Sequence, residues 1–79
     1  MIIKYRINKD GTKCWFKNNQ HHRPNNPAIE CVNCTKKWFQ NGRYHRTDGP
    51  AVEWADGRKY WYIDDKYCTE VEHNQLVSK

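Results

Sequence analysis

The chain has 79 residues, of which 37% are hydrophobic and 14% aromatic, and its mean hydropathy is −1.20. This composition allows one small domain and excludes a large aliphatic core, so apolar burial must come mainly from the four Trp, five Tyr and two Phe. The net charge of +5 is unevenly distributed, because residues 1–46 carry a net charge of +8 and residues 47–79 one of −3. The first half could therefore attract a polyanion such as nucleic acid.

Neither a signal peptide nor a membrane span is expected. Lys4 and Arg6 interrupt the apolar start of the chain, and no apolar segment approaches the roughly 20 residues that a membrane-spanning helix needs. We therefore expect a cytoplasmic protein whose four cysteines stay reduced.

The first predicted elements form a β-hairpin. Residues 2–7 contain β-branched and aromatic side chains in a short run, which predicts a strand. Asp10-Gly11 predicts a tight turn, because glycine tolerates the positive φ that a short hairpin loop needs. Residues 12–17 are the next predicted strand, and Asn18-Asn19 reverses the chain after it.

The same pattern recurs with a fixed period. Three tryptophans are spaced 23 residues apart, and each is followed by a second aromatic residue. These pairs are Trp15-Phe16, Trp38-Phe39 and Trp61-Tyr62. Two His-Arg pairs share this spacing, His22-Arg23 and His45-Arg46, as do Pro27-Ala28 and Pro50-Ala51. A period of this length indicates an array of supersecondary units.

Each repeat is expected to contain a strand, a turn, a short strand, a proline corner and a further strand. The corners lie at residues 24–27 and 48–50, because proline cannot donate a hydrogen bond inside a strand. Strands follow at 28–32 and 51–55, and residues 58–63 and 66–71 form the last hairpin around Asp64-Asp65. The repeat pattern ends at Glu72.

We therefore predict one all-β repeat domain over residues 1–72 and a flexible C-terminal tail over residues 73–79. The domain is expected to be a twisted antiparallel β-hairpin meander of about two and a half 23-residue repeats. The period of two in a strand places the tryptophans on one face and Phe16, Phe39 and Tyr62 on the other. Either both aromatic rows fill a thin core, or one row is covered while the other stays partly open as a binding surface. The edge strands at 2–7 or 66–71 could pair with a second copy in a homodimer.

The string from Trp38 to Ala51, W-F-x-N-G-x-x-H-R-x-D-G-P-A, resembles a repeat common in bacteriophage, bacterial and large-virus proteins. That family is similar to MORN repeats, and the resemblance covers roughly residues 10–71. Arg23 and Arg46 depart from the MORN pattern, which has a glycine after the histidine, and the third copy has Cys68-Thr69 in place of His-Arg. The resemblance implies successive β-hairpins in an elongated sheet, binding to proteins or membranes, and no catalytic residues.

These observations favour a non-enzymatic protein-interaction module without a cofactor. The resemblance implies a small phage accessory protein that binds a host protein, in host takeover, in counter-defence, or as a protein sensed by host defence. The predicted contact residues are Trp15, Trp38, Trp61, Arg23, Arg43, Tyr44 and Arg46. An exposed aromatic and basic face of this kind could also stack bases and hold phosphates, which makes nucleic-acid binding one alternative. The other reading of the arginines is that they pack along aromatic rings within the repeat.

The second alternative is a small zinc-binding module. Cys31 and Cys34 have the C-x-x-C spacing of a zinc knuckle, and His21, His22, Cys14 or Cys68 could supply the two further ligands. The competing interpretation is that these are ordinary buried or turn cysteines. His22 and His45 recur at one repeat position, which favours a structural role in bonding backbone carbonyls.

Overall fold

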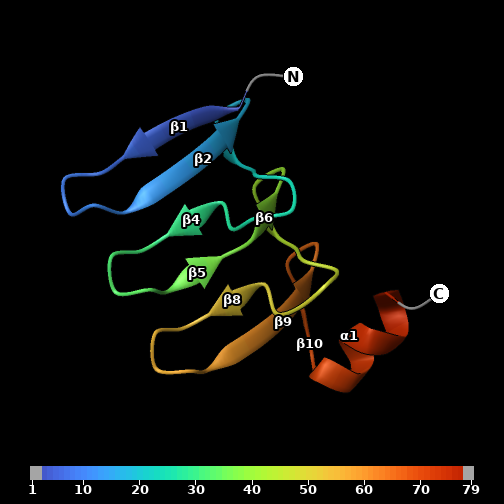
Figure 1. Cartoon of the computed structure of the whole chain (residues 1–79). Coiled ribbons are helices and arrows are strands. Elements are labelled where there is room, and N and C mark those ends of the chain that lie inside the picture. Colours follow the sequence, from blue (N-terminus) through green and yellow to red (C-terminus); the bar gives the residue numbers. More distant parts are fainter. Residues whose placement is uncertain (1–2, 78–79) are drawn as a thin grey trace.

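The protein is described here by a computed structural model that covers residues 3–77, so Ile2 of the first predicted strand lies outside the described residues. The chain is mainly antiparallel β-structure with one short helix, which confirms the predicted all-β hairpin meander (Figure 1). Its extents of 38 × 32 × 16 Å make it thin in one direction. A single layer of hairpins, rather than two packed sheets, accounts for this shape.

Ten strands and one helix are present among the described residues. They are β1 (Lys4–Ile7), β2 (Lys13–Lys17), β3 (Gln20–His21), β4 (Ile29–Glu30), β5 (Lys36–Lys37), β6 (Phe39–Gln40), β7 (Arg43–Tyr44), β8 (Val52–Glu53), β9 (Lys59–Ile63), β10 (Lys66–Cys68) and α1 (Glu70–Val77). The main sheet has the order β1-β2-β4-β5-β8-β9-β10, with β3 paired to β2, while β6 and β7 pair with each other. All pairs are antiparallel.

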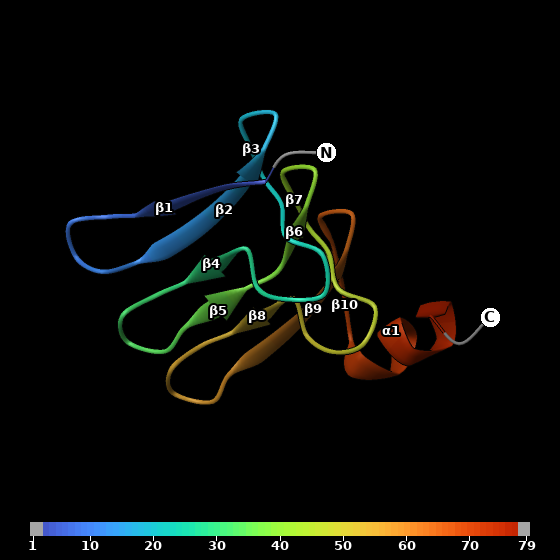
Figure 2. The same cartoon turned by 45° about the horizontal axis from the view of Figure 1, so that its top comes forward.

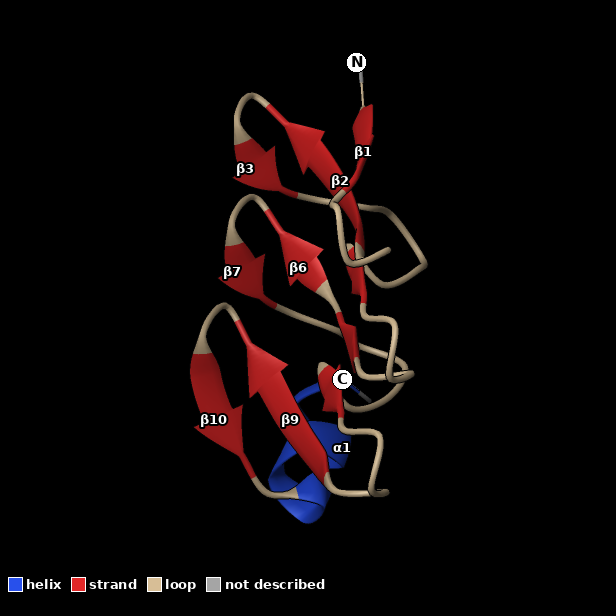
Figure 3. Cartoon of the chain, turned by 90° about the vertical axis from the view of Figure 1, so that its left-hand side faces the viewer, coloured by secondary structure: helices blue, strands red, loops and turns tan. Residues whose placement is uncertain are grey.

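The hairpins form two stacks that meet along the tryptophan strands. The first stack contains β1-β2, β4-β5 and β8-β9, whose turns lie on the left in Figures 1 and 2. The second stack contains β2-β3, β6-β7 and β9-β10, which lie above one another in Figure 3. Strands β2 and β9 run from one stack into the other, and β5 and β6 do the same with Trp38 between them. Trp15, Trp38 and Trp61 are therefore each placed at the junction of the two stacks.

Backbone hydrogen bonds repeat with the period of the sequence. In the turns of the first stack, the N–H of the first residue donates to the carbonyl oxygen four residues later, at 2.8–2.9 Å. The three pairs are Asn8–Thr12, Cys31–Thr35 and Trp54–Arg58. Gly11, Cys34 and Gly57 occupy the same turn position with φ of 92°, 76° and 96°. Cys34 therefore adopts a left-handed conformation that glycine adopts at much lower cost.

The buried apolar residues gather at the junction of the stacks. They are Cys14, Ala28, Trp38, Phe39, Ala51, Val52 and Cys68. Ala28 and Ala51 are fully buried, and their carbonyl oxygens accept the N–H groups of Trp15 and Trp38 at 2.9 and 2.7 Å. A larger side chain at either alanine would have no space, which explains why a small residue follows the corner proline in both copies.

The C-terminal segment differs from the prediction. A strand to residue 71 and a flexible tail from residue 73 are expected from the sequence, whereas residues 70–77 form helix α1. Thr69 caps this helix, because its hydroxyl accepts the N–H of Glu72 while the Glu72 carboxylate accepts the N–H of Thr69. His73 is only 1% exposed, and its Nε2 forms a hydrogen bond with the carbonyl oxygen of Arg46. The helix has no apolar stripe, so periodicity could not reveal it. Residues 78–79 lie outside the described part of the chain.

Candidate functional site

The second corner is closed by an arginine that stacks on the tryptophan of the same repeat. The Arg46 guanidinium carbon lies 3.8 Å from the centre of the Trp38 ring, and Nη1 donates to the Glu53 carboxylate and the Pro50 carbonyl oxygen at 3.0 Å. Arg46 Nε donates to Asp48 at 2.8 Å, and this hydrogen bond holds the pKa of the Asp48 carboxyl below its ordinary value. Only 19% of the Arg46 side chain is exposed. Nε and Nη1 of Arg46 are therefore engaged within the corner.

The first corner repeats this arrangement. Arg23 lies 3.7 Å from the centre of the Trp15 ring and donates to Glu30 at 3.0 Å and to the Pro27 carbonyl oxygen at 3.2 Å. This agrees with the interpretation that the arginines pack along aromatic rings within the repeat. Four of the predicted contact residues are thus engaged inside the repeats. They are Trp15, Trp38, Arg23 and Arg46.

The two recurring histidines hold the next hairpin of the second stack. Nδ1 of His22 accepts the N–H of Asn41 at 2.9 Å, and Nδ1 of His45 accepts the N–H of Asp64 at 3.2 Å. The role is structural, as expected, but the partner is a backbone N–H rather than a carbonyl. Burial, with a smaller effect of Lys17, lowers the pKa of His22, which favours the neutral ring that this acceptor role requires.

The face opposite Trp15, Trp38 and Trp61 carries a continuous row of rings in contact, which we call the aromatic ladder. It consists of Phe16, His21, Phe39, Tyr44, Tyr62 and Tyr67. Ring centres are 4.4 to 5.8 Å apart along the row, and the pairs Phe39–Tyr44 and Tyr44–Tyr62 are stacked. Tyr44 is partly buried, which raises the pKa of its hydroxyl. The last ring of the row, Tyr67, is 60% exposed. The ladder therefore begins in packed rings and ends in an open one.

A hollow of about 260 Å³ lies where the ladder meets the first stack, and we call it the aromatic hollow. It is lined by Tyr44, Val52, Trp54, Arg58, Tyr60 and Tyr62. Trp54 is 38% exposed, and the cations of Arg58 and Lys37 lie 5.4 and 5.5 Å from its ring centre. No carboxylate of residues 3–77 forms an ion pair with Lys37. The hollow thus has aromatic walls, and Lys37, which has no acidic partner among the described residues, lies beside its Trp54 ring.

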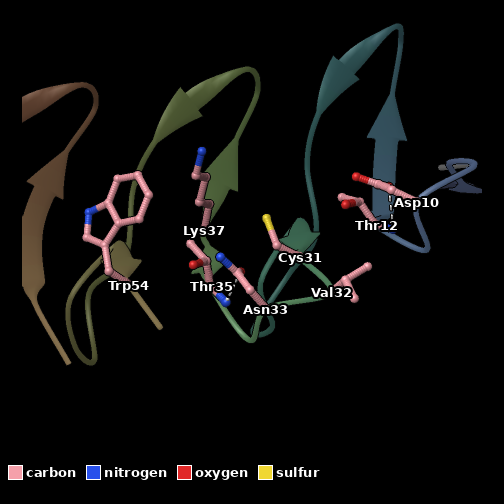
Figure 4. Close-up of a pocket in the computed structure, with 8 residues that line it drawn as sticks. All are labelled: Asp10, Thr12, Cys31, Val32, Asn33, Thr35, Lys37 and Trp54. Atoms are coloured by element: carbon pink, nitrogen blue, oxygen red, sulfur yellow. Dashed lines mark hydrogen bonds between the residues drawn. The ribbon is translucent and has the colours of Figure 1, made fainter. Parts of the chain in front are cut away.

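A second hollow of about 370 Å³ continues from Trp54 along the turns of the first stack (Figure 4). It is lined by Asp10, Thr12, Cys31, Val32, Asn33, Thr35, Lys37 and Trp54. Figure 4 shows Lys37 and Trp54 pointing to the same side, and Val32 is 63% exposed. Trp54 lines both hollows and is therefore the central side chain of this surface.

Of the three remaining predicted contact residues, Arg43 and Tyr44 are neighbours on β7, whereas Trp61 lies on β9. Tyr44 is a middle ring of the ladder, Arg43 is exposed on β7, and Trp61 is half-buried on β9, where α1 packs. The prediction did not include Trp54 or Tyr67. Trp54 is the one tryptophan that lies outside the 23-residue spacing, whereas Tyr67 recurs at that spacing with His21 and Tyr44 and could have been found from it.

The four cysteines do not converge. Cys31 and Cys34 lie in one turn, where the Cys34 N–H donates to the Cys31 carbonyl oxygen at 3.0 Å, and burial raises the pKa of the Cys14 and Cys68 thiols. Within residues 3–77, no group of three or more His, Cys, Asp or Glu side chains is arranged to hold a metal ion.

Comparison of the chain with protein-family models, with curated proteins and with solved structures finds no match. Among the described residues, no helix is long and apolar enough to span a membrane.

Proposed function

We propose that the protein is a non-enzymatic interaction module that binds another protein through the aromatic hollow and the adjoining turn surface. The observation that carries this proposal is the exposure of Trp54 between two hollows, with Lys37 and Arg58 beside its ring. Tryptophan, tyrosine and arginine are the residues that contribute most to binding when they lie near the centre of a protein interface. Val32 and Tyr67 extend the apolar surface on either side of this centre.

The charges of this surface indicate the chemistry of the partner. Arg58 already pairs with Asp56 at 2.8 Å, whereas none of the carboxylates of residues 3–77 pairs with Lys37, whose ammonium lies 5.5 Å from the centre of the Trp54 ring. A partner that inserts an apolar side chain beside Trp54 and places a carboxylate near Lys37 would satisfy both features. Such a pair of contacts is typical of protein surfaces.

Nucleic acid fits the same surface less well. Arg23 and Arg46 are occupied by Glu30 and Glu53, and Asp65 accepts the N–H of Tyr44 beside the aromatic ladder. A phosphate backbone needs several free cations, and a carboxylate close to the stacking rings opposes it.

The biological setting is proposed from the resemblance of the string Trp38 to Ala51 to repeats of bacteriophage proteins. On that basis the chain is a phage accessory protein in the cytoplasm of a bacterial host, where it engages a host protein during takeover or defence.

The test is an affinity pull-down of the tagged chain from bacterial lysate, with and without nuclease, followed by calorimetry on the purified captured protein. We expect a stoichiometric protein that survives nuclease and that binds the Trp54→Ala variant at least about tenfold more weakly. Val71→Ala is the matched control, because Val71 is 65% exposed on α1, away from both hollows. Prey that disappears with nuclease would favour nucleic-acid binding instead. Equal affinity of both variants would show that the hollow is not the contact surface.

A further inference from the structure

The two terminal strands of the main sheet differ in what covers them. At one end, the terminal strand β10 pairs with β9, and α1 packs on both strands. At the other end, β1 pairs with β2 alone, and none of residues 3–77 pairs with its outer side. All four residues of β1 are exposed, with Tyr5 at 51% and Ile7 at 56%. An uncovered strand at the edge of a sheet is a template for a further strand.

The register shows which backbone groups face outward. Trp15 directs its N–H toward Ala28, away from β1, so its register partner Tyr5 is not hydrogen-bonded to it. Tyr5 therefore directs its own N–H and C=O outward. Alternation along an antiparallel strand gives Ile7 the same orientation, whereas Arg6 bonds to Cys14. The open edge thus offers two residues, each with one donor and one acceptor, to an added strand.

The side chains around this edge are cationic and apolar. Register partners across the inner sheet alternate in charge as Lys13, Glu30, Lys36, Glu53 and Lys59. This row ends at Ile7, which is opposite Lys13 on the outer side. Among the described residues, no carboxylate pairs with Lys4 or Arg6, and Asp10 is engaged by the N–H of Thr12. An incoming strand thus finds apolar side chains on one face and unpaired cations on the other.

A second copy of the chain is a poor occupant of this edge. Antiparallel pairing of two β1 strands about Arg6 places Arg6 opposite Arg6 of the other copy. Pairing about Tyr5 places Lys4 of each copy opposite Arg6 of the other. Like charges directly opposite one another destabilise a strand pair. A homodimer through β1 is therefore disfavoured in the registers centred on Arg6 and on Tyr5.

We propose that the outer edge of β1 binds an extended acidic segment of another protein as an added strand. Apolar side chains of that segment lie beside Tyr5 and Ile7, and its carboxylates lie beside Lys4 and Arg6. The inference rests on the proposed protein-interaction function and adds a second contact surface to it, on the first repeat rather than around Trp54.

The experiment measures the anisotropy of a short fluorescent peptide in which Glu and Val alternate, titrated with the full chain. Two control peptides carry Lys in place of Glu, or methyl groups on alternate backbone nitrogens. We expect binding of the first peptide only, because the lysine peptide reverses the charge and the methylated one cannot complete the ladder. If the methylated peptide bound equally well, charge attraction alone would account for binding, and the proposal would be overturned.

A matched pair of variants tests the same point within the protein. Tyr5→Ala and Tyr5→Pro both remove the ring from Trp15, but only Tyr5→Pro also removes the outward N–H. We expect the proline variant to bind the acidic peptide about tenfold more weakly than the alanine variant. Equal affinities would overturn the proposal, and should the proline variant fail to fold, the methylated peptide still decides. Sedimentation that shows a dimer in the wild type and a monomer in Tyr5→Pro would assign the edge to a second copy.

These outcomes are separable from those of the proposed function. A captured protein that Tyr5→Pro still binds, with no binding of the acidic peptide, would leave the interaction function in place and remove the edge. Peptide binding without any captured protein would support the edge and contradict the wider function.

Discussion

The central and third repeats cover their equivalent tryptophans, Trp38 and Trp61, in two different ways. Trp38 lies under Arg46 and is 9% exposed, whereas residues 68–69 are Cys and Thr, so Trp61 has no arginine to cover it. Helix α1 lies there instead, and its residues 74–76 have the sequence positions that residues 51–53 have in the central repeat. The corner and the helix are therefore alternative covers for one strand. Only the corner supplies a further strand on which another repeat could build.

The largest effect is expected from removing the tryptophans themselves. Trp38→Ala should lower the free energy of unfolding by about 3–5 kcal/mol, because a buried ring leaves a cavity at the junction of the stacks. Trp61→Ala should cost less, since Trp61 is half-buried. Urea unfolding of both variants, followed by fluorescence, measures the difference. A larger loss for Trp61 would mean that α1, not the corner, is the tighter cover.

The next effect concerns the cover of the central repeat. Arg46→Glu should lower the free energy of unfolding by about 2–3 kcal/mol, because it breaks the contacts with Trp38 and Pro50 and sets two carboxylates together at Glu53. Arg43→Glu is the control, since Arg43 is exposed, and its melting temperature should stay close to that of the wild type. An unchanged melting temperature of Arg46→Glu, with binding lost, would instead make Arg46 a surface contact.

The cover of the third repeat is expected to be weaker. Thr69→Ala removes the hydroxyl that accepts the Glu72 N–H and should cost about 1 kcal/mol. Circular dichroism and thermal unfolding measure the loss, and Thr69→Ser should restore most of the stability. If Thr69→Ala were as damaging as Arg46→Glu, the two covers would be equivalent.

The first and third repeats should differ in how a fall in pH affects stability. Burial lowers the folded-state pKa of His22, so the unfolded chain binds a proton more readily, and stability should fall as the pH drops through about 6.5. In the third repeat Cys68 stands in the histidine position and donates to the Trp61 carbonyl oxygen at 3.6 Å, so it adds no such dependence. Melting temperatures at pH 7.5 and 5.5 test this, and His22→Asn should flatten the profile. A steeper profile in that variant would contradict the assignment.

The smallest expected effect has the opposite sign. Cys34→Gly should raise the free energy of unfolding by about 0.5–1 kcal/mol, because Cys34 has φ of 76° where Gly11 and Gly57 stand in the other copies. Gly57→Cys is the reverse substitution and should destabilise by a similar amount. Thermal unfolding of both under reducing conditions compares them, and equal signs would contradict the role of backbone conformation.

The repeat and its hairpins could be predicted because period and turn chemistry are local. Trp15, Trp38 and Trp61 define the unit, and Asn41-Gly42 and Asp56-Gly57 define its turns. The placement of the arginines on the tryptophans could not be derived, because the sequence does not show whether the Arg46 side chain packs on Trp38 or extends into solvent. The helix was missed since its signals are the capping residues Thr69 and Glu72 alone.

The candidate site was predicted less well than the fold. An aromatic and basic surface was expected, but around the recurring residues, which the corners use for their own packing. The exposed centre, Trp54, occupies a position where the first copy has Cys31. A residue that breaks the period is free of the packing that the period enforces, and function is more readily placed there.

The hydrogen bonds of the two recurring histidines run in the same direction along the chain. His22 receives an N–H from the second repeat, and His45 receives one from the third. Each of these two imidazole acceptors is thus present in the growing polypeptide before the backbone N–H that it binds has been made. Helix α1 follows the repeats in the chain, and its His73 links back to the second corner through the carbonyl oxygen of Arg46.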